Sequence, residues 1–435
     1  MSAVLSERIA QEHAAASAGL PSSVVSAAGR ARAVQALRDL GLPTTRDENW
    51  KYANLRSLEK NAFRPVTQER RAKVTAADLP AAVAGYARYV FVDGLFAPEL
   101  SATTDHAGVT VRAGKAAAIA RAPEPPHGGS SDERFALLNE AFVIDRARVH
   151  APKGADCAAC VEILFVATEP AENAASYPRL ELEVEANARV GIIERHLSVG
   201  SDANFVNGVV QAIIGPGAQV SHYRLQQAGA RSTWLDTLAA SVEKDARYTL
   251  HFVNVGALSA RSTSRVQLNG PGAEVAIHVV SLADGQQVHD GLALIEHIAP
   301  NTKSDQSVRG IAGGRSRVAF NSKVVVREHA RGTDSKQSLR GLLTGTQAEI
   351  DVRPQLEIYT DDVRCNHGAT AGKLDDNMLF YLLSRGIEKE IAQQLLKWAF
   401  LEDVVSRIAV PELRKHIEQS LAGQMKETAA LKELL

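Results

Sequence analysis

The sequence predicts a mainly β protein: a β-solenoid of stacked coils flanked by N- and C-terminal α-helical domains. Three observations support this. Residues from about 149 to 363 read as short strands and turns with almost no helical periodicity. Within them a turn motif recurs at an interval near 30 residues. Helical periodicity occurs on both sides of this stretch, in residues 1–60 and again after Lys373. A chain of 435 residues is long enough for one elongated repeat with end pieces.

The repeat consists of a turn residue followed by small and β-branched residues. Its copies are anchored at Val190, Val220, Tyr248, Val275, Val318 and Ile350. The intervals between these anchors are 30, 28, 27, 43 and 32 residues. A second echo supports the period, since SDQSVRG begins at Ser304 and SKQSLRG begins 31 residues later at Ser335. Strands repeating in this way without crossover helices exclude a doubly wound sheet and favour stacked coils. A β-sandwich remains the alternative.

Helices are expected at both ends of the repeat. Residues 22–40 have apolar residues at helical spacing and stop at Gly41. Residues 375–385 and 388–402 form two further helices, the second with a wide apolar face. That face is either core against its neighbour or a docking surface for another protein. The expected domains are an N-terminal helical and mixed domain (1–145), a solenoid core (146–372) and a C-terminal helical domain (373–435).

Composition excludes several classes of partner. The 49 basic and 50 acidic residues give a formal charge of −1, which argues against nucleic acid or an anionic membrane as the main partner. The first 20 residues lack the apolar core of a signal peptide, and the most apolar run, Val161 to Ala167, is too short to span a bilayer. Three cysteines are no disulfide framework and suit a reducing compartment. We therefore expect a cytoplasmic protein.

Motifs for common enzyme classes are missing. The segment from Gly368 to Leu374, GATAGKL, is one residue short of a P-loop and ends in Leu, so no nucleotide is expected to bind this chain. The sequences GPG at 215–217 and 270–272 read as turns, and neither GxSxG nor HExxH occurs. A carbohydrate-active β-helix enzyme is an alternative, but aromatic content is 5% and no acidic pair stands out as general acid and base.

The repeat contains cysteines and histidines, which are residue types that bind metals. Cys157 and Cys160 form a CxxC with no partner pair, which is half a zinc site at most. They precede the strand-like run VEILFV, where residues three apart point to opposite faces, so a buried apolar role is the better interpretation. We expect the histidines of the repeat to be mainly polar-face or hydrogen-bonded strand residues; they are His222, His251, His278, His289 and His297.

The segment from Pro354 to Ala371, PQLEIYTDDVRCNHGATA, concentrates the remaining chemistry. Cys365 and His367 are two residues apart, so on an extended backbone both side chains point to the same side. A thiolate and a neutral imidazole are ligands that iron accepts, and histidine is largely neutral at cellular pH. A complete site needs three or four ligands, and this segment offers two. The alternative is a tight turn with a buried cysteine.

This segment resembles a known family. Residues 361–372, DDVRCNHGATAG, are followed by LDDNMLFYLLSRGI and a helix that ends in WAF at 398–400. Together they resemble the C-terminal signature of the Suf iron-sulfur cluster assembly proteins. With the N-terminal motif ENWKY at 48–52, the Cys-x-His-Gly-Ala-Thr motif is similar to the SufD members of the SufB/SufD family rather than to the paralogous SufB members. The resemblance covers most of the chain, more loosely in the middle.

The resemblance implies a fold and a function. The core would be a right-handed parallel β-helix, and the chain would be a non-catalytic scaffold subunit that pairs with a SufB-like paralogue. A SufC-like ATPase would hydrolyse ATP and dock on the C-terminal helices. His367, and less certainly Cys365, would contribute to a nascent iron-sulfur cluster shared at the SufB interface. The isolated chain can also pair with itself as a homodimer. A purely structural interaction subunit without a cluster ligand is the alternative.

The resemblance assigns ATPase docking to the two C-terminal helices. The candidate docking residues on them are Leu379, Phe380, Arg385, Leu395, Leu396 and Phe400.

Overall fold

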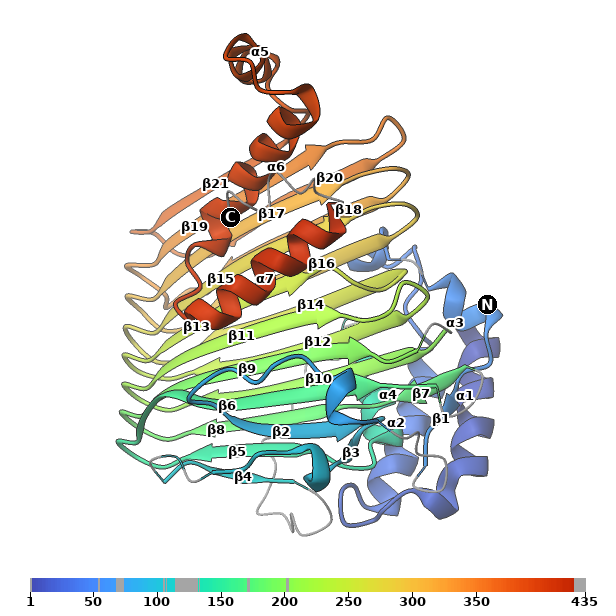
Figure 1. The fold of residues 1–435 in the computed structure, drawn as a ribbon. Coiled ribbons are helices and arrows are strands. Elements are labelled where there is room, and N and C mark those ends of the chain that lie inside the picture. Colours follow the sequence, from blue (N-terminus) through green and yellow to red (C-terminus); the bar gives the residue numbers. More distant parts are fainter. Residues whose placement is uncertain are drawn as a thin grey trace.

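The computed structural model describes residues 2–53, 55–67, 74–104, 106, 108–113, 132, 134–169, 173–200 and 203–425. Its centre is a stack of coils in which successive strands alternate between two sheets (Figure 1). Seven such strand pairs follow one another, from β8 and β9 to β20 and β21. Sheet A has 11 strands and sheet B has 10 strands.

The elements have the following bounds. Sheet A contains β1 (Arg64–Pro65), β4 (Thr110–Arg112), β5 (Ala147–Ala151), β7 (Ala174–Ser176), β8 (Arg179–Val184), β10 (Phe205–Ile214), β12 (Thr233–Val242), β14 (Ser259–Leu268), β16 (Val288–His297), β18 (Arg317–Val326) and β20 (Glu349–Ile358). Sheet B contains β2 (Ala87–Val92), β3 (Leu95–Phe96), β6 (Asp156–Ala167), β9 (Arg189–Ser198), β11 (Gln219–Gln227), β13 (Arg247–Asn254), β15 (Glu274–Ala283), β17 (Lys303–Ala312), β19 (Asp334–Leu343) and β21 (Arg364–Gly372). The α-helices are α1 (Ser2–Ala16), α2 (Ala27–Leu40), α3 (Arg56–Lys60), α4 (Arg134–Phe142), α5 (Asp376–Ser384), α6 (Lys389–Val405) and α7 (Pro411–Gln424). Short 3₁₀ turns are η1 (Ser17–Gly19), η2 (Glu48–Trp50), η4 (Ala76–Asp78) and η5 (Pro98–Leu100).

Parallel pairing confirms the predicted solenoid. From β8 and β9 onward, each strand pairs in parallel with the strand one coil earlier, and each strand before β20 also pairs in parallel with the strand one coil later. The β-sandwich alternative is wrong, because its sheets are antiparallel. The echo at Ser304 and Ser335 is a true register pair of β17 and β19. The right-handed sense of the coil stays a prediction.

The odd interval of 43 residues has a structural cause. Val190, Val220, Tyr248 and Val275 are successive register partners in sheet B. Val318 and Ile350, by contrast, are register partners in sheet A. The anchors of the sequence repeat therefore change from sheet B to sheet A after Val275. The interval at this change is longer because it includes the additional half-coil between the two sheets.

A column of left-handed turn residues explains the recurring turn motif. One residue per coil has φ between 53° and 73°, and all are Asn, Asp or Gly: Asn187, Gly217, Asp245, Gly272, Asn301, Gly332 and Asp362. These residue types tolerate that conformation best. A Cβ on Gly217 would lie 2.3 Å from Asn187 Oδ1. The side chain of Asn187 therefore fills the space that a side chain at Gly217, one coil later, would need. Asp362 is the last member of the column and precedes β21.

The N-terminal end of the stack is closed by antiparallel strands. Strand β3 folds back on β2 through the two-residue turn Asp93-Gly94, whose φ values are 51° and 84°. A two-residue hairpin turn is typical of the dipeptide Asp-Gly, which adopts these left-handed conformations easily. Strand β4 pairs antiparallel with β5 in the same way on sheet A. Since β2 pairs in parallel with β6, the strand stack takes in part of residues 1–145.

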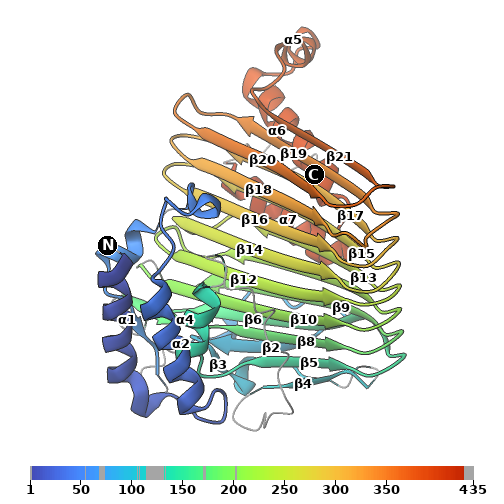
Figure 2. The same cartoon turned by 180° about the vertical axis from the view of Figure 1, so that it is seen from behind.

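Helices α1, α2 and α4 lie beside the outer face of sheet A (Figure 2). Helix α2 begins after Ser26, whose side chain caps Gly29 N, and ends at Gly41 as predicted. Phe205 and Leu235 point outward from sheet A into the helical core. Trp50 is buried there, beneath the Arg261 guanidinium at 4.3 Å from its ring centre.

Helices α6 and α7 pack on the outer face of sheet B, as Figure 1 shows. Trp398 and Leu401 of α6 are buried against outward residues of the sheet, such as Val280 and Ile311. The wide apolar face of α6 is therefore mainly core. Helix α5 differs, because it has no buried residue and projects beyond the end of the stack. None of the helices among the described residues is long and apolar enough to cross a membrane.

Candidate metal site at the open end of the solenoid

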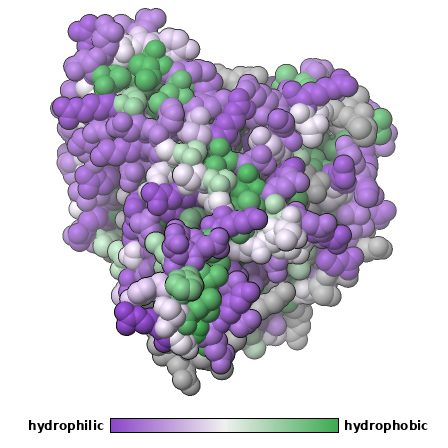
Figure 3. All heavy atoms as spheres, turned by 90° about the horizontal axis from the view of Figure 1, so that it is seen from above, coloured by the Kyte–Doolittle hydropathy of each residue, from purple (hydrophilic) through white to green (hydrophobic). Residues whose placement is uncertain are grey.

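The last coil, β20 and β21, is the open end of the stack. Among the strands that the structure describes, β20 pairs with β18 alone and β21 pairs with β19 alone, so each has one unpaired edge. Val352, Leu356 and Val363 pack against the core but are only partly buried, and Ile358 and Tyr359 are 42% and 56% exposed. Seen from this end, apolar patches interrupt a mainly hydrophilic surface (Figure 3). Unpaired edges beside an uncovered apolar layer are features of a surface that binds another chain.

Cys365 and His367 lie on this open layer. Cys365 is in register with Ser335, and His367 is in register with Gln337. Both partners are buried inside the solenoid, at 0% and 4% exposure, so Cys365 and His367 continue interior columns of side chains. The prediction that they share one side of a strand is confirmed. Because no described strand pairs with the outer edge of β21, Cys365 is half-buried and His367 is exposed.

The environment of Cys365 keeps its thiol protonated until a metal competes for the sulfur. Burial raises the pKa of Cys365, and the carboxylate of Asp334 raises it further, while the backbone N–H of Ser335 opposes them. Metals bind the thiolate, so binding here releases a proton.

A column of hydroxyl groups continues beneath Cys365. Ser304 Oγ donates to Ser335 Oγ at 2.9 Å, and Ser304 Oγ also pairs with His297 Nε2 at 2.9 Å. The other ring nitrogen of His297 pairs with Thr302 Oγ1 at 2.8 Å. Burial lowers the pKa of His297 to about 4, so the ring is neutral at pH 7. The Ser335 hydroxyl thus accepts from Ser304, and Ser335 itself is the register partner of Cys365.

Cys365 and His367 do not complete a metal site by themselves. Among the residues that the structure describes, one group of three metal-type side chains has its donor atoms within 4.8 Å of one another, and it is Glu194, His196 and Asp236. Cys365 and His367 belong to no such group. The metal site at Cys365 and His367 stays a prediction, and a complete site of three or four ligands would need donors from elsewhere.

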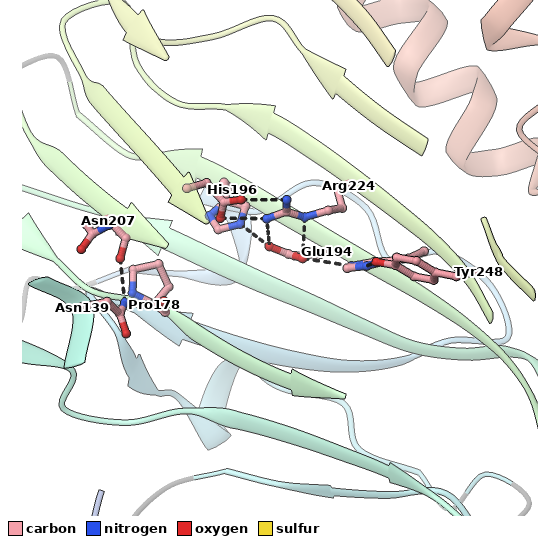
Figure 4. A network of polar contacts seen from close by, with 9 residues as sticks. Asn139, Pro178, Glu194, His196, Asn207, Arg224 and Tyr248 are labelled. Atoms are coloured by element: carbon pink, nitrogen blue, oxygen red, sulfur yellow. Dashed lines mark hydrogen bonds and ion pairs between the residues drawn. The ribbon is translucent and has the colours of Figure 1, made fainter. Parts of the chain in front are cut away.

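The group at Glu194 belongs to a polar network inside the solenoid (Figure 4). Arg224 donates to Glu194 Oε1 and Oε2 at 2.7 and 2.8 Å, and to Asp236 Oδ1 and Oδ2 at 2.9 and 2.8 Å. His196 Nε2 pairs with Glu194 Oε1 at 2.6 Å. The guanidinium thus occupies the position between the two carboxylates that a metal cation would need.

His222 and Tyr248 extend the network. His222 Nε2 pairs with Glu194 Oε2, and His222 Nδ1 pairs with Tyr248 Oη, both at 2.9 Å. Burial alone raises the pKa of Glu194, but Arg224 and the two histidines hold it well below its ordinary value. Burial lowers the pKa of His222. We interpret the network as structural, since nearly every charged atom has a partner within the chain.

Sequence reasoning missed Glu194, Arg224 and Asp236. They lie on β9, β11 and β12, and only the coil register brings them together. The available signal was the occurrence of charged residues within otherwise apolar strand runs, such as GIIERH at 191–196.

The prediction that Cys157 and Cys160 point to opposite faces is wrong. A register shift between Cys157 and Val161 in β6 forms a bulge, and both cysteines are buried in the same core cluster. A bulge adds a residue and changes which side chains face inward. Their buried apolar role is confirmed. Burial raises the pKa of both thiols.

The other histidines are buried strand residues, as expected. His289 pairs with Ser281 Oγ at 3.1 Å and Gly256 O at 2.8 Å. His251 and His278 lie on the outer face of sheet B with ring centres 5.0 Å apart. There His278 Nδ1 is 3.3 Å from an Arg407 nitrogen of the helical layer.

The predicted docking residues divide between two helices. On α5, Phe380 is 71% exposed, Arg385 is exposed and Leu379 is half-buried. On α6, the three candidates are half-buried beside sheet B: Leu395, Leu396 and Phe400. Three further exposed apolar residues of α5 were missed: Met378, Tyr381 and Leu383. The exposed apolar surface is thus concentrated on α5.

Comparison with known families gives one match over the centre of the chain. The family described as "SUF system FeS cluster assembly, SufBD core domain" matches residues 165–400. This range begins in β6 and ends in α6, so it includes the open end with Cys365 and His367.

Several curated proteins are similar over most of their length. The iron-sulfur cluster assembly protein SufD of Escherichia coli is 29% identical over 92% of this chain and 97% of its own length. An iron-sulfur cluster assembly SufBD family protein of Synechocystis is 29% identical over 90% of both chains. A SufBD family protein of Mycobacterium leprae is 27% identical over 68% of this chain and 76% of its own.

Proposed function

The chain belongs to the SufBD family of the SUF iron-sulfur cluster assembly system, and from this premise we propose that it is a non-catalytic scaffold subunit. Its open end pairs with a second solenoid chain of the SufB type, and the pair builds and transfers nascent iron-sulfur clusters. The single observation that carries the proposal is the uncovered last coil, with His367 and Cys365 on its interior side.

The nascent cluster is cargo in this account. The imidazole of His367 and the thiolate of Cys365 suit iron, and the partner chain supplies the remaining ligands. His367 is the principal ligand because it is exposed, whereas Cys365 is half-buried against the core. Pairing covers the apolar layer of β20 and β21 and removes water from the shared site.

Helix α5 is the docking surface for a SufC-type ATPase. Its support is the exposed apolar side chains of Met378, Phe380 and Tyr381 on a helix without buried residues. Arg385 lies 5.1 Å from the centre of the Tyr381 ring and adds a cation to this surface. ATP hydrolysis belongs to that partner, and this chain binds no nucleotide.

The chain works in the cytoplasm, where its three free thiols stay reduced. In the absence of the SufB-type partner, two copies pair through the same open ends as a homodimer, since an unpaired edge that binds a paralogue can bind itself.

The test is cluster formation on the complex assembled with SufB-type and SufC-type partners. His367→Ala should abolish cluster formation, followed by visible absorbance, while size-exclusion chromatography shows intact assembly. His329→Ala is the matched control, because His329 is an exposed histidine that lies outside β21. Unimpaired cluster formation with His367→Ala would overturn the proposal and favour a purely structural subunit.

A further inference from the structure

Beneath His367 lies a buried chain of amide and hydroxyl groups that ends in an unpaired acceptor. Gln337 Nε2 donates to Ser322 Oγ at 2.6 Å and to the Ser322 carbonyl oxygen at 3.1 Å. Ser322 Oγ donates to Gln306 Oε1 at 2.5 Å. Gln337 and Gln306 are 4% and 0% exposed. Gln337 Oε1 is buried and has no hydrogen-bond partner.

The orientation of the Gln337 amide is fixed by its contacts. A backbone carbonyl only accepts, so the group facing the Ser322 carbonyl has to be the amide nitrogen. The oxygen therefore points elsewhere and cannot be exchanged with the nitrogen by flipping the amide. Leaving a buried acceptor without a partner is unfavourable. Gln337 Oε1 shares this state with other buried polar atoms, among them Gln306 Nε2, and it differs from Gln306 Nε2 in lying one coil from the open end, where His367 can reach it.

The next residue in the same column is His367. Gln306, Gln337 and His367 are successive register partners on β17, β19 and β21. In-register residues on paired strands lie about 5 Å apart, within reach of a ring N–H. The side chain of His367 makes no hydrogen bond to any residue that the structure describes. Its ring is therefore free to turn toward the column.

We propose that Gln337 is a positioning residue for His367, whose ring N–H donates to Gln337 Oε1. This inference rests on the proposed ligand role of His367 and adds the residue that orients the ring. The hydrogen bond fixes which ring nitrogen carries the proton, and it leaves the other nitrogen as a lone-pair donor directed away from the column. Histidine ligands almost always have such a partner on the second nitrogen.

The chain of groups strengthens this contact. The N–H of His367 donates to Gln337 Oε1, Gln337 Nε2 donates to Ser322 Oγ, and Ser322 donates to Gln306 Oε1. Hydrogen bonds in series polarise one another in a water-poor interior. The first link forms when a partner chain covers the end and removes the water that competes for the His367 ring.

The spectroscopic test measures the tautomer of His367 in the cluster-free complex, in which only this chain carries ¹⁵N-labelled histidine and unlabelled SufB-type and SufC-type partners cover the open end. The ring-nitrogen shifts are recorded at pH 8, and His367→Ala identifies the signal. We expect one tautomer to dominate in the wild type. Gln337→Leu, which removes the acceptor oxygen, should shift the signal toward the mixture found in free imidazole. Gln219→Leu is the matched control, because Gln219 is an exposed residue of β11 outside this chain of groups, and it should leave the tautomer unchanged.

The functional test uses the assembled complex. Gln337→Leu should slow cluster formation about tenfold, while Gln219→Leu stays near the wild-type rate. An identical His367 tautomer in the wild type and in Gln337→Leu would overturn the inference. That outcome differs from failure of the proposed function, in which His367→Ala itself leaves cluster formation unimpaired whatever the tautomer data show.

Discussion

Two histidines occupy the same column of the solenoid and have opposite surroundings. His222 and His367 are joined by successive register pairs through Leu250, Ile277, Gln306 and Gln337. Their backbones are equivalent, and both side chains belong to the interior side of sheet B. Strands flank the strand of His222 on both edges, whereas β21 has one neighbour. The difference between the two residues is therefore the missing coil.

That difference decides what each histidine can do. Both ring nitrogens of His222 are hydrogen-bonded, to Glu194 and to Tyr248, and the side chain is fully buried. It has no lone pair to offer, and burial lowers its pKa. His367 has an exposed ring with no hydrogen bond to a described residue. An interior position of this solenoid is accessible to a ligand role only where the stack ends.

The largest contrast should appear when the buried network is broken. Arg224→Met leaves the carboxylates of Glu194 and Asp236 without their common cation, and it should lower the free energy of unfolding by about 3–5 kcal/mol. His367→Ala removes an exposed side chain and should change it by less than about 0.5 kcal/mol. Urea denaturation measures both. Equal losses would contradict the contrast between a sealed interior and an open end.

A smaller effect should follow from one hydroxyl of the same network. Tyr248→Phe leaves His222 Nδ1 buried without a partner, and it should cost about 1–3 kcal/mol. Tyr359→Phe is the matched control, because Tyr359 is 56% exposed at the open end. Its unfolding midpoint in urea should equal that of the wild type. A stable Tyr248→Phe protein would show that His222 is not held by this bond.

The helical layer on sheet B should respond to pH. Burial, His278 and Arg407 together lower the pKa of His251 to about 3, and burial and Arg407 lower that of His278 to about 4. Burial also lowers the pKa of His416 to about 4, aided by Arg195. Released histidines titrate near 6.5, so the released state binds more protons below that pH. The docked state is fully stable above pH 6.5 and loses stability as the pH falls toward 4.

Hydrogen exchange can measure this dependence. After correction for intrinsic rates, the amides of α6 and α7 should lose protection between pH 7 and pH 5. In His278→Asn, which removes one titrating ring, the loss should be smaller. Asp305 and Asp403 also face this region, and they oppose the shift at His278. Protection that is independent of pH would show that these histidines do not control docking.

The smallest expected effect is a difference in how fast the three cysteine thiols are alkylated. Cys365 is half-buried at the open end, and Cys157 and Cys160 are 7% and 0% exposed. Iodoacetamide at pH 8 should modify Cys365 first, as read by peptide mass spectrometry, and a SufB-type partner should protect it. Equal modification of all three cysteines would contradict the buried bulge in β6.

The solenoid was predictable because each coil contains a turn that only certain residue types favour. Asn187, Gly217 and Asp245 adopt the same left-handed conformation one coil apart, and each is followed by an inward β-branched or aromatic residue. Such a signal gives the length of the repeat but does not tell to which of the two sheets a strand belongs. The anchors at Val318 and Ile350 repeat the same pattern in sheet A, and sequence alone could not separate them from those in sheet B.

The site was predictable in part, for a related reason. The spacing of Cys365 and His367 on a strand indicated a shared side, and β21 confirms it. The columns beneath them could not be predicted, because Ser322, Gln306 and Gln337 are brought together only by the closure of each coil between two sheets. The inward direction of Cys157 and Cys160 was missed for the same kind of reason, since a bulge leaves little trace in sequence.

The most direct test of the central claim is to detect the nitrogen of His367 on the cluster. Only this chain is labelled with ¹⁵N-histidine, it is assembled with unlabelled partners, and the reduced cluster is examined by pulsed electron paramagnetic resonance. The account predicts a coupling to ¹⁵N that is present in the wild type and in His329→Ala and disappears in His367→Ala. Absence of ¹⁵N coupling in the wild type, or a coupling that survives His367→Ala, would contradict it.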